Sequence, residues 1–350
     1  MKVSVFVFKP DEIGDFVIST GSIRVLAGNY GEENVVLAVK SEIAPLAKRE
    51  FPAAKVIGIP WQAKRKGKNQ ALANLRSCLP VWREFRKLRV DDAVCLRSCR
   101  NYVQTLLFSA PSARRSIAPE NMLLRNGAAR RRFVEFALVR STGVKIVTYP
   151  VQTGSLPKEI SSHRDVVAEA LGRKVSAEEI TPSFRSSRWH GGNGWLLCPF
   201  SSRLSKDYDA ARWAAALDTV AHSSRPPILL AGSPDQAERL QKFADDLGAA
   251  GFRHPVKVMP PSPLREFPDV VSAADLVLTV DTAAAHFACA LGAPAVIVDS
   301  GKNPGTYGPY SPNGKQLWLV ADRARLGRSR WQESVPPQMV AESIKRALSA

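Results

Sequence analysis

One stretch of sequence decides the fold class of this chain: Leu276-Val-Leu-Thr-Val-Asp-Thr-Ala-Ala-Ala-His-Phe-Ala-Cys-Ala-Leu-Gly-Ala-Pro294. Its first residues are apolar or β-branched, which predicts a buried strand over 276–279. Small residues follow Asp281 and Thr282 at once, and they predict a helix over 283–291. A strand that runs directly into a helix is typical of a parallel sheet with helical crossovers.

The same alternation extends outward from this stretch in both directions. In the second half, strands are expected at 195–198, 228–230, 256–258 and 295–298, and helices at 209–220, 234–247, 264–273 and 338–348. In the first half, strands are expected at 3–8, 35–39, 56–59 and 92–96, and helices at 16–27, 44–51 and 163–171. The chain is therefore predicted to be an α/β protein with two doubly wound, Rossmann-like domains facing across a cleft.

The domain boundary is predicted from a change in composition between the two sets of alternating strands and helices. The polar stretch 183–193, rich in Ser, Arg and Gly, is expected to hold the linker or to follow it closely. We expect domains at 1–180 and 181–335, and a terminal helix at 336–350 that can pack back on the first domain.

Composition narrows the class of protein further. Hydrophobic residues make up 45% of the 350 residues, as in globular proteins, and no stretch approaches the ~18 apolar residues of a membrane span. The first apolar run ends early at Pro10 and Asp11, unlike a signal peptide. The five scattered cysteines complete no zinc set. We expect a cytoplasmic protein that can also be peripheral at the inner membrane, with neither a metal nor a cofactor.

The net charge of +17 favours anionic partners. Nucleic acid, an anionic membrane surface and a phosphorylated substrate all satisfy it.

The loop after the quoted strand offers a phosphate site. Asp281 and Thr282 precede Ala283 and Ala284, whose small side chains let a ligand approach the N–H groups at the start of the helix. Asp281 and Thr282 can instead act only as helix caps. His286, about one turn later, is either a ligand contact or a buried structural histidine.

Two further loops follow strands of the second half. The hydroxyls of Ser201 and Ser202 and the cation of Lys206 form a plausible pyrophosphate clamp, although an ordinary polar loop has the same composition. Gly232 relieves crowding at a strand end, and Ser233 there can cap the next helix.

The first strand is followed by Pro10-Asp-Glu-Ile-Gly-Asp15. Gly14 allows a tight turn, which would leave Asp15 at the mouth of the cleft, where a carboxylate can accept a proton from a hydroxyl. Taken alone, a helix cap is the simpler interpretation of Asp15. No dinucleotide fingerprint and no Walker sequence occurs.

These loops, in this order, resemble glycosyltransferase family 9, the heptosyltransferases of lipopolysaccharide core assembly. The first signature is matched by Lys9, Asp11, Ile13, Gly14 and Asp15. The second is matched by Asp281, Thr282, His286, Ala290, Leu291, Gly292 and Pro294, and Tyr307-Gly-Pro309 is similar to a later turn of the family.

The resemblance implies a GT-B fold and an inverting, one-step displacement that needs no metal. It makes Asp15 the base that deprotonates the acceptor hydroxyl. Lys206 and the hydroxyls of Ser201 and Ser202 would neutralise the leaving diphosphate, as would the backbone at 282–284. Asp281 would bind sugar hydroxyls, and the expected donor is ADP-heptose.

Three departures from the family pattern place the donor in doubt. Asp207 and Tyr208 stand where an aromatic-Pro pair is common, and Ala283 replaces the usual Gly. Gln236 stands where a Glu often holds the nucleotide ribose.

Basic residues of the first half are the expected contacts of an acidic or phosphorylated glycan acceptor. They can equally be solvated surface charges. The residues are Lys64, Arg65, Lys66, Lys68, Arg97 and Arg100.

Other readings stay open at this stage. The donor or acceptor can belong to another surface glycan such as a capsule, or the fold can carry an epimerase. From a different class, a non-catalytic protein that binds nucleotides or nucleic acid fits the charge, but the basic runs lack interleaved aromatic residues and no specific nucleic-acid partner is expected.

Overall fold

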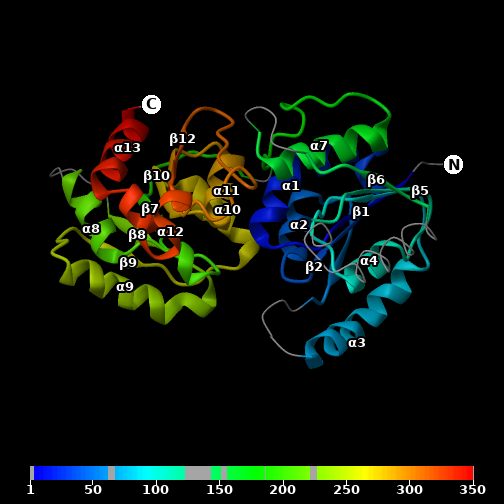
Figure 1. Cartoon of the computed structure of the whole chain (residues 1–350), viewed down its shortest axis with the longest axis horizontal. Coiled ribbons are helices and arrows are strands. Elements are labelled where there is room, and N and C mark those ends of the chain that lie inside the picture. Colours follow the sequence, from blue (N-terminus) through cyan, green and yellow to red (C-terminus); the bar gives the residue numbers. More distant parts are fainter. Residues whose placement is uncertain are drawn as a thin grey trace. The chain divides into compact units, whose positions relative to one another are not determined.

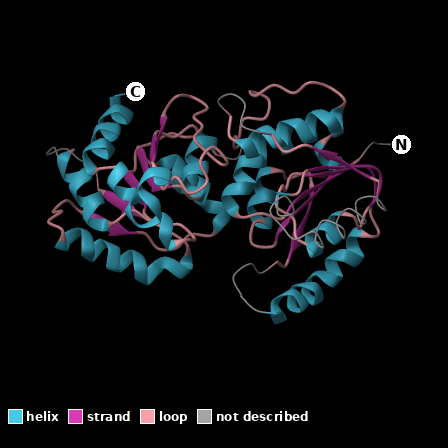
Figure 2. Ribbon diagram, viewed as in Figure 1, coloured by secondary structure: helices cyan, strands magenta, loops and turns pink. Residues whose placement is uncertain are grey.

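The computed structural model describes residues 4–61, 68–122, 143–150, 156–185, 187–220 and 227–349, with the backbone alone at 68–75 and Tyr102. The chain divides into two compact units, Met1–Pro182 and Ser183–Ala350. Each unit is a parallel sheet covered by helices (Figures 1 and 2).

The first unit alternates strands and helices along the chain. Its elements are β1 (Val5–Lys9), α1 (Ile13–Tyr30), β2 (Val35–Lys40), α2 (Ala44–Glu50), β3 (Lys55–Ile59), α3 (Lys68–Phe85), β4 (Arg89–Cys95), α4 (Tyr102–Phe108), β5 (Ser112–Pro119), β6 (Val144–Val147) and α7 (Lys158–Leu171).

The second unit repeats the pattern. Its elements are β7 (Trp195–Cys198), α8 (Ala210–Thr219), β8 (Ile228–Leu230), α9 (Ala237–Ala249), β9 (Val256–Val258), α10 (Phe267–Ala273), β10 (Leu276–Val280), α11 (Ala283–Leu291), β11 (Ala295–Asp299), β12 (Gln316–Val320), α12 (Arg323–Arg330) and α13 (Pro337–Ser349).

Both sheets have six strands and the same doubly wound topology. The strand orders are β3-β2-β1-β4-β5-β6 and β12-β11-β10-β7-β8-β9, and each pair of neighbours runs parallel. When β7 to β12 are renumbered as strands one to six of their own unit, the second sheet has the same strand order as the first, read from the opposite edge. The predicted α/β class and the two Rossmann-like domains are confirmed.

The apolar strands explain why helices cover both faces. β1, β10 and β11 are buried along their whole length, so neither face of these central strands meets water. In the first unit α3 and α4 supply one layer of the core, through Phe85 and Phe108 packed near Phe6 and Phe8. In the second, α8, α9 and α13 supply one layer, which includes Trp213. The carboxyl ends of the strands are left to the loops.

The helix after β1 begins earlier than the sequence predicted. α1 starts at Ile13, so Gly14 lies inside the helix and Asp15 stands in its first turn. The chain reverses instead at Pro10–Glu12, where Pro10 cannot continue the strand ladder. The expected tight turn at Gly14 is wrong, and Asp15 takes its position from the helix.

Several elements carried no clear sequence signal. α12 is almost wholly polar, and β12 is an edge strand with partly exposed residues, so neither has a readable apolar period. α13 packs on α8 and β11 of the second unit, through Val340, Ala341 and Ile344.

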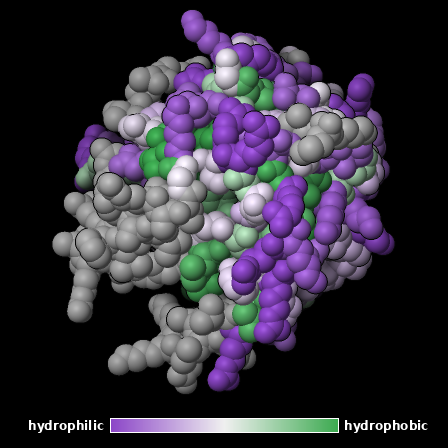
Figure 3. Space-filling view, turned by 90° about the vertical axis from the view of Figure 1, so that its right-hand side faces the viewer, coloured by the Kyte–Doolittle hydropathy of each residue, from purple (hydrophilic) through white to green (hydrophobic). Residues whose placement is uncertain are grey.

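No helix among the described residues combines the length and the apolar character that a membrane crossing requires. Figure 3 shows hydrophobic residues as separate small areas among hydrophilic ones on the face in view. Scattered exposed apolar side chains of this kind are normal on globular proteins.

Candidate active site

Lys206 and Asp281 meet at the carboxyl edge of the second sheet. Asp281 follows β10, and Lys206 ends a short 3-10 helix (Leu204–Lys206) in the loop after β7, the neighbouring strand. The Lys206 ammonium forms an ion pair with the Asp281 carboxylate, and its Nζ lies 3.3 Å from the Asp281 backbone oxygen, to which it donates. The sequence placed both residues in one site, and the fold brings them into contact.

The start of α11 lies beside this pair. Thr282 is the N-cap residue, but its side chain makes no capping hydrogen bond. Ala283 and Ala284 form the first turn without long side chains over the backbone. The first N–H groups of a helix have no partner inside the helix, so this terminus keeps the geometry of a phosphate site.

His286 is buried one turn into α11. Its Nδ1 lies 3.2 Å from the Tyr310 hydroxyl, its ring stacks on the Tyr310 ring, and its Nε2 lies 4.0 Å from Asp281 Oδ1. Burial lowers the pKa of His286 to about 4, against the opposing effect of Asp281. A neutral imidazole held in this way supports the structural interpretation, with its Nε2 edge toward the carboxylate.

The loop after β7 is closed by its own hydrogen bonds. The Ser201 hydroxyl donates to Arg203 O at 2.8 Å and accepts from Arg203 N at 3.0 Å, whereas Ser202 is exposed. The Ser201 backbone N–H donates to Asp207 Oδ1 at 2.9 Å. Ser202 is therefore the more accessible hydroxyl of the two.

The two unusual residues after Lys206 have structural partners. Asp207 forms an ion pair with Arg239, whose guanidinium lies 3.7 Å from the centre of the Phe200 ring. The buried Tyr208 donates from its hydroxyl to Val335 O at 2.8 Å. These contacts hold the loop that carries Lys206.

Gly232 and Gln236 form a tight turn after β8. A Cβ on Gly232 would lie 2.6 Å from Gln236 Oε1, so a larger residue there would displace the Gln236 amide. Gln236 Oε1 accepts from Ser233 N at 3.1 Å. The amide oxygen of Gln236 is thus used by its own helix start.

Asp15 in the first unit is partly exposed, and its surroundings are acidic as well as basic. Burial raises the pKa of Asp15 to about 6, Lys9 opposes this shift, and Glu159 and Glu12 add to it. A carboxylate with a pKa near 6 is ionised at neutral pH and remains a useful proton acceptor.

Lys9 stands at the centre of a buried polar network behind Asp15. Its Nζ lies 2.7 Å from Leu96 O, 2.9 Å from Asp11 Oδ2 and 3.5 Å from Glu159 Oε1. Burial lowers the pKa of Lys9, while Glu159 and Asp15 raise it. A fully buried ammonium is stable only with such partners.

Glu159 lies in the first turn of α7 and accepts further hydrogen bonds. Its Oε2 accepts from Ser98 Oγ at 2.8 Å and from the Tyr149 hydroxyl at 3.2 Å. Burial alone would raise its pKa, but Lys9 and His163 outweigh burial and hold the pKa of Glu159 below its usual value. Glu159 therefore stays ionised and fixes the position of Lys9.

The sequence did not predict that Glu159, Tyr149 and His163 belong to this buried network. Nothing in their local pattern marks them, since they lie about 140–150 residues after Lys9 and only the fold brings them together. Lys9 and Asp11 were visible as signature residues, but their burial was not.

The candidate acceptor residues fall into two groups. Lys64, Arg65 and Lys66 lie outside the described residues, and Lys68 opens α3 without a described side chain. Arg97 forms an ion pair with Asp11. Arg100 is 2% exposed and donates to Arg97 O and Pro119 O, so an acceptor could reach it only if this loop opened.

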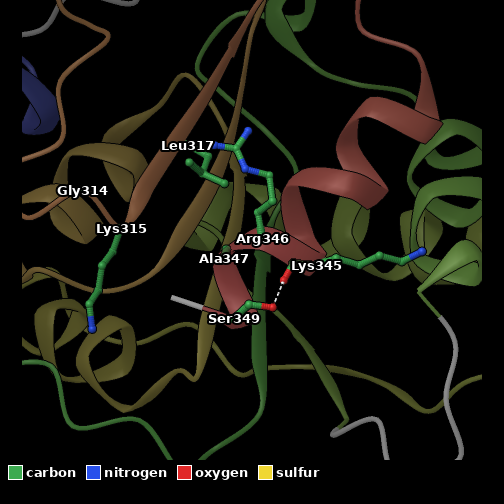
Figure 4. Close-up of a pocket in the computed structure, with 7 residues that line it drawn as sticks. All are labelled: Gly314, Lys315, Leu317, Lys345, Arg346, Ala347 and Ser349. Carbon is green, nitrogen blue, oxygen red and sulfur yellow. Dashed lines mark hydrogen bonds between the residues drawn. The ribbon is translucent and has the colours of Figure 1, made fainter.

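A surface hollow of about 390 Å³ lies elsewhere, between the start of β12 and the end of α13 (Figure 4). Lys315 and Lys345 extend away from each other there, and the strand begins rather than ends at this edge. Ligands of parallel α/β sheets bind at the opposite edge, where Lys206 and Asp281 lie.

Comparison with solved structures defines the class of fold. E. coli heptosyltransferase WaaC with ADP matches with a TM-score of 0.70 at 16% identity, covering 99% of this chain and 100% of that one. A glycosyltransferase family 9 structure from Veillonella parvula matches with a TM-score of 0.69 at 15% identity, covering 100% and 99%. The protein has the GT-B fold.

Sequence comparison then finds a similar family. The model of glycosyltransferase family 9 (heptosyltransferase) matches residues 173–331. Lipopolysaccharide heptosyltransferase 1 of Escherichia coli K12 is 29% identical over 126 residues, 36% of this chain and 37% of the relative. The Salmonella typhimurium protein of that name is 28% identical over 113 residues, 32% and 34%. The match spans about a third of the length of these relatives, and residues 173–331 are similar to glycosyltransferase family 9.

Proposed function

We propose that this protein transfers a heptose or a related sugar from a nucleoside-diphosphate sugar to an acidic or phosphorylated glycan such as lipopolysaccharide core. ADP-heptose is the first candidate donor. The observation that carries the proposal is the contact between Lys206 and Asp281 beside the uncapped start of α11. The solved relative named as a complex of WaaC with ADP-2-deoxy-2-fluoro heptose supports the choice of donor.

The second unit supplies the donor chemistry in this proposal. The leaving diphosphate gains negative charge as the glycosidic bond breaks. The Lys206 ammonium, the Ser202 hydroxyl and the N–H groups of Ala283 and Ala284 would stabilise that charge. Asp281 would accept from sugar hydroxyls while it orients Lys206.

The first unit supplies the base. Asp15 would take the proton of the acceptor hydroxyl as that oxygen attacks the sugar carbon from the face opposite the diphosphate, which inverts the configuration. The buried network of Lys9 and Glu159 supports this role, because it fixes the field in which Asp15 titrates.

The proposal is tested by a thermal-shift panel of ADP-, GDP-, UDP- and CMP-sugars, followed by transfer to a dephosphorylated and a phosphorylated core glycan. A ligand that binds the folded state raises its melting temperature. Stabilisation by one nucleotide series and transfer from it are expected. Salt-dependent binding of arbitrary DNA without any nucleotide-sugar binding would instead favour the non-catalytic alternative.

The pH profile of transfer should report Asp15. Below about pH 6 the carboxyl group holds its proton and cannot accept another, so kcat/KM is expected to fall as the pH drops through about 6. Glu159→Gln removes a negative charge that raises the pKa of Asp15, so the acidic limb should move to lower pH. If the acidic limb of the pH profile is unchanged in Glu159→Gln, and the variant has normal thermal stability, Glu159 does not influence the pKa of Asp15.

The basic run after β3 is proposed to contact the acceptor. Replacing Lys64, Arg65, Lys66 and Lys68 with Gln is expected to raise the acceptor KM on the order of tenfold at low salt and to leave donor affinity unchanged. Initial rates at varied acceptor and a separate donor titration measure the two effects. A fall in donor affinity would contradict the assignment of this run to the acceptor.

The location at an anionic membrane face is likewise a proposal, supported by the net charge of +17. Vesicles with anionic lipids should then retain the protein better than neutral ones.

A further inference from the structure

Four cationic side chains gather beside Lys206 at the carboxyl edge of the second sheet. They are Arg203 in the loop after β7, Lys302 after β11, and Arg323 and Arg328 after β12. We call these four residues the cationic cluster. Since β12, β11, β10 and β7 are neighbouring parallel strands, the loops that follow them meet at one edge. The pKa of Lys302 is lowered by burial and then by the other three members and Lys206, which indicates that these four cations lie near Lys302.

In the part of the chain that the structure describes, the cluster has acidic neighbours but no ion pair with them. None of its four side chains takes part in an ion pair there, whereas Arg330 on the same helix pairs with Glu333 at 2.7 Å. The acids at this edge have other partners. Asp281 pairs with Lys206, the buried Asp299 accepts from Gly301 N at 2.9 Å, and Asp322 accepts from Arg325 N at the start of α12.

The backbone holds Lys302 and Arg323 near each other. Gly301 has a φ of +64°, and a Cβ there would lie 2.2 Å from Ala321 O and 3.3 Å from Arg323 Cβ. The loops after β11 and β12 are therefore packed in direct contact. Within the described ranges, Ser300 Oγ and Arg323 Nη1 are buried without a hydrogen-bond partner. Buried polar groups of this kind are usually satisfied by a ligand or by water.

Charge balance indicates what the cluster binds. In the proposed function, Lys206 and the start of α11 already face the two phosphates of the donor. Four more positive charges close together repel one another, and an anion relieves that repulsion.

We propose that Arg203, Lys302, Arg323 and Arg328 form a second anion subsite, whose ligand is a phosphate or carboxylate group that a substrate carries in addition to the donor diphosphate. This inference rests on the proposed function. The additional group belongs either to the transferred sugar or to the acceptor, and the chemistry of recognition is the same for both.

Calorimetric titration with inorganic pyrophosphate and tripolyphosphate tests the subsite directly. The unaltered protein is expected to bind tripolyphosphate about tenfold more tightly than pyrophosphate. Lys302→Gln with Arg323→Gln should abolish this preference, because it should lower the affinity for tripolyphosphate more than the affinity for pyrophosphate. The matched control is Arg330→Gln, an exposed cation of α12 with its own carboxylate, which should keep the preference.

Retention of the tripolyphosphate preference in the double variant would overturn the proposal, as would its absence in the unaltered protein. Because removal of repelling charges does not unfold a domain, the variant is expected to keep its melting temperature. If the double variant is unstable, the single variant Lys302→Gln is compared with the unaltered protein in the same titrations.

Substrates identify the source of the anion. If the double variant loses discrimination between an acidic and a neutral nucleoside-diphosphate sugar, the group is on the donor. If it raises KM only for a phosphorylated acceptor, the group is on the acceptor. Failure of the unaltered protein to bind any nucleoside diphosphate would refute the proposed function, and the tripolyphosphate comparison would still decide the subsite.

Discussion

Asp15→Asn is expected to lower the turnover of sugar transfer by about a thousandfold, because a positioned general base contributes roughly 10²–10⁴ in rate and the amide cannot accept the proton. Donor affinity should stay within about twofold, since Asp15 belongs to the first unit and the donor residues to the second. The measurement is kcat at saturating donor and acceptor, with a separate donor titration.

The matched control for Asp15 is Glu12→Gln, because Glu12 is an exposed carboxylate just before the same helix and pairs with Lys40. It should retain transfer within a few-fold, because Glu12 is exposed and its buried partner Lys40 keeps Glu42 at 3.8 Å. Normal turnover in Asp15→Asn would remove Asp15 as the base and leave the fold assignment intact.

Lys206→Ala is the second change with a large expected effect. Nucleoside-diphosphate affinity should fall by about ten- to a hundredfold, because a charge-assisted contact in a largely buried site contributes about 1.5–3 kcal/mol. Transfer should slow further, since the diphosphate carries most charge in the transition state. Titration with the nucleoside diphosphate and single-turnover transfer measure the two effects.

A loss of diphosphate affinity in Lys206→Ala can also have a second cause, which a further variant distinguishes. Removing Lys206 leaves the buried Asp281 carboxylate without its ion pair, which alone can disturb the site. Lys206→Ala with Asp281→Asn removes the unpaired charge, and its diphosphate affinity should remain low if Lys206 binds phosphate directly. Restored affinity would make Lys206 a structural partner. Lys242→Ala, which removes an exposed lysine that pairs with Asp246, should change nothing.

The surroundings of Asp15 and Lys206 explain why substitution of either residue should have a large effect. Each group lies at the carboxyl edge of a parallel sheet, where helices and strands fix its backbone, and each has a buried partner of opposite charge nearby. Such support keeps a reacting group in one geometry.

Local sequence by itself determined most of the strands and covering helices and the doubly wound class, because apolar periodicity and loop chemistry depend on neighbouring residues; it gave no sign of β5, β6 and β12. The residues after β10, β7 and β1 were singled out this way, among them Asp281, Lys206 and Asp15. Tertiary structure alone decided the contacts between distant segments: Lys9 with Glu159, Lys302 with Arg323, and the commitment of Arg100 to its own loop. Burial and charge pairing depend on which strand ends meet in space, and no local pattern carries that information.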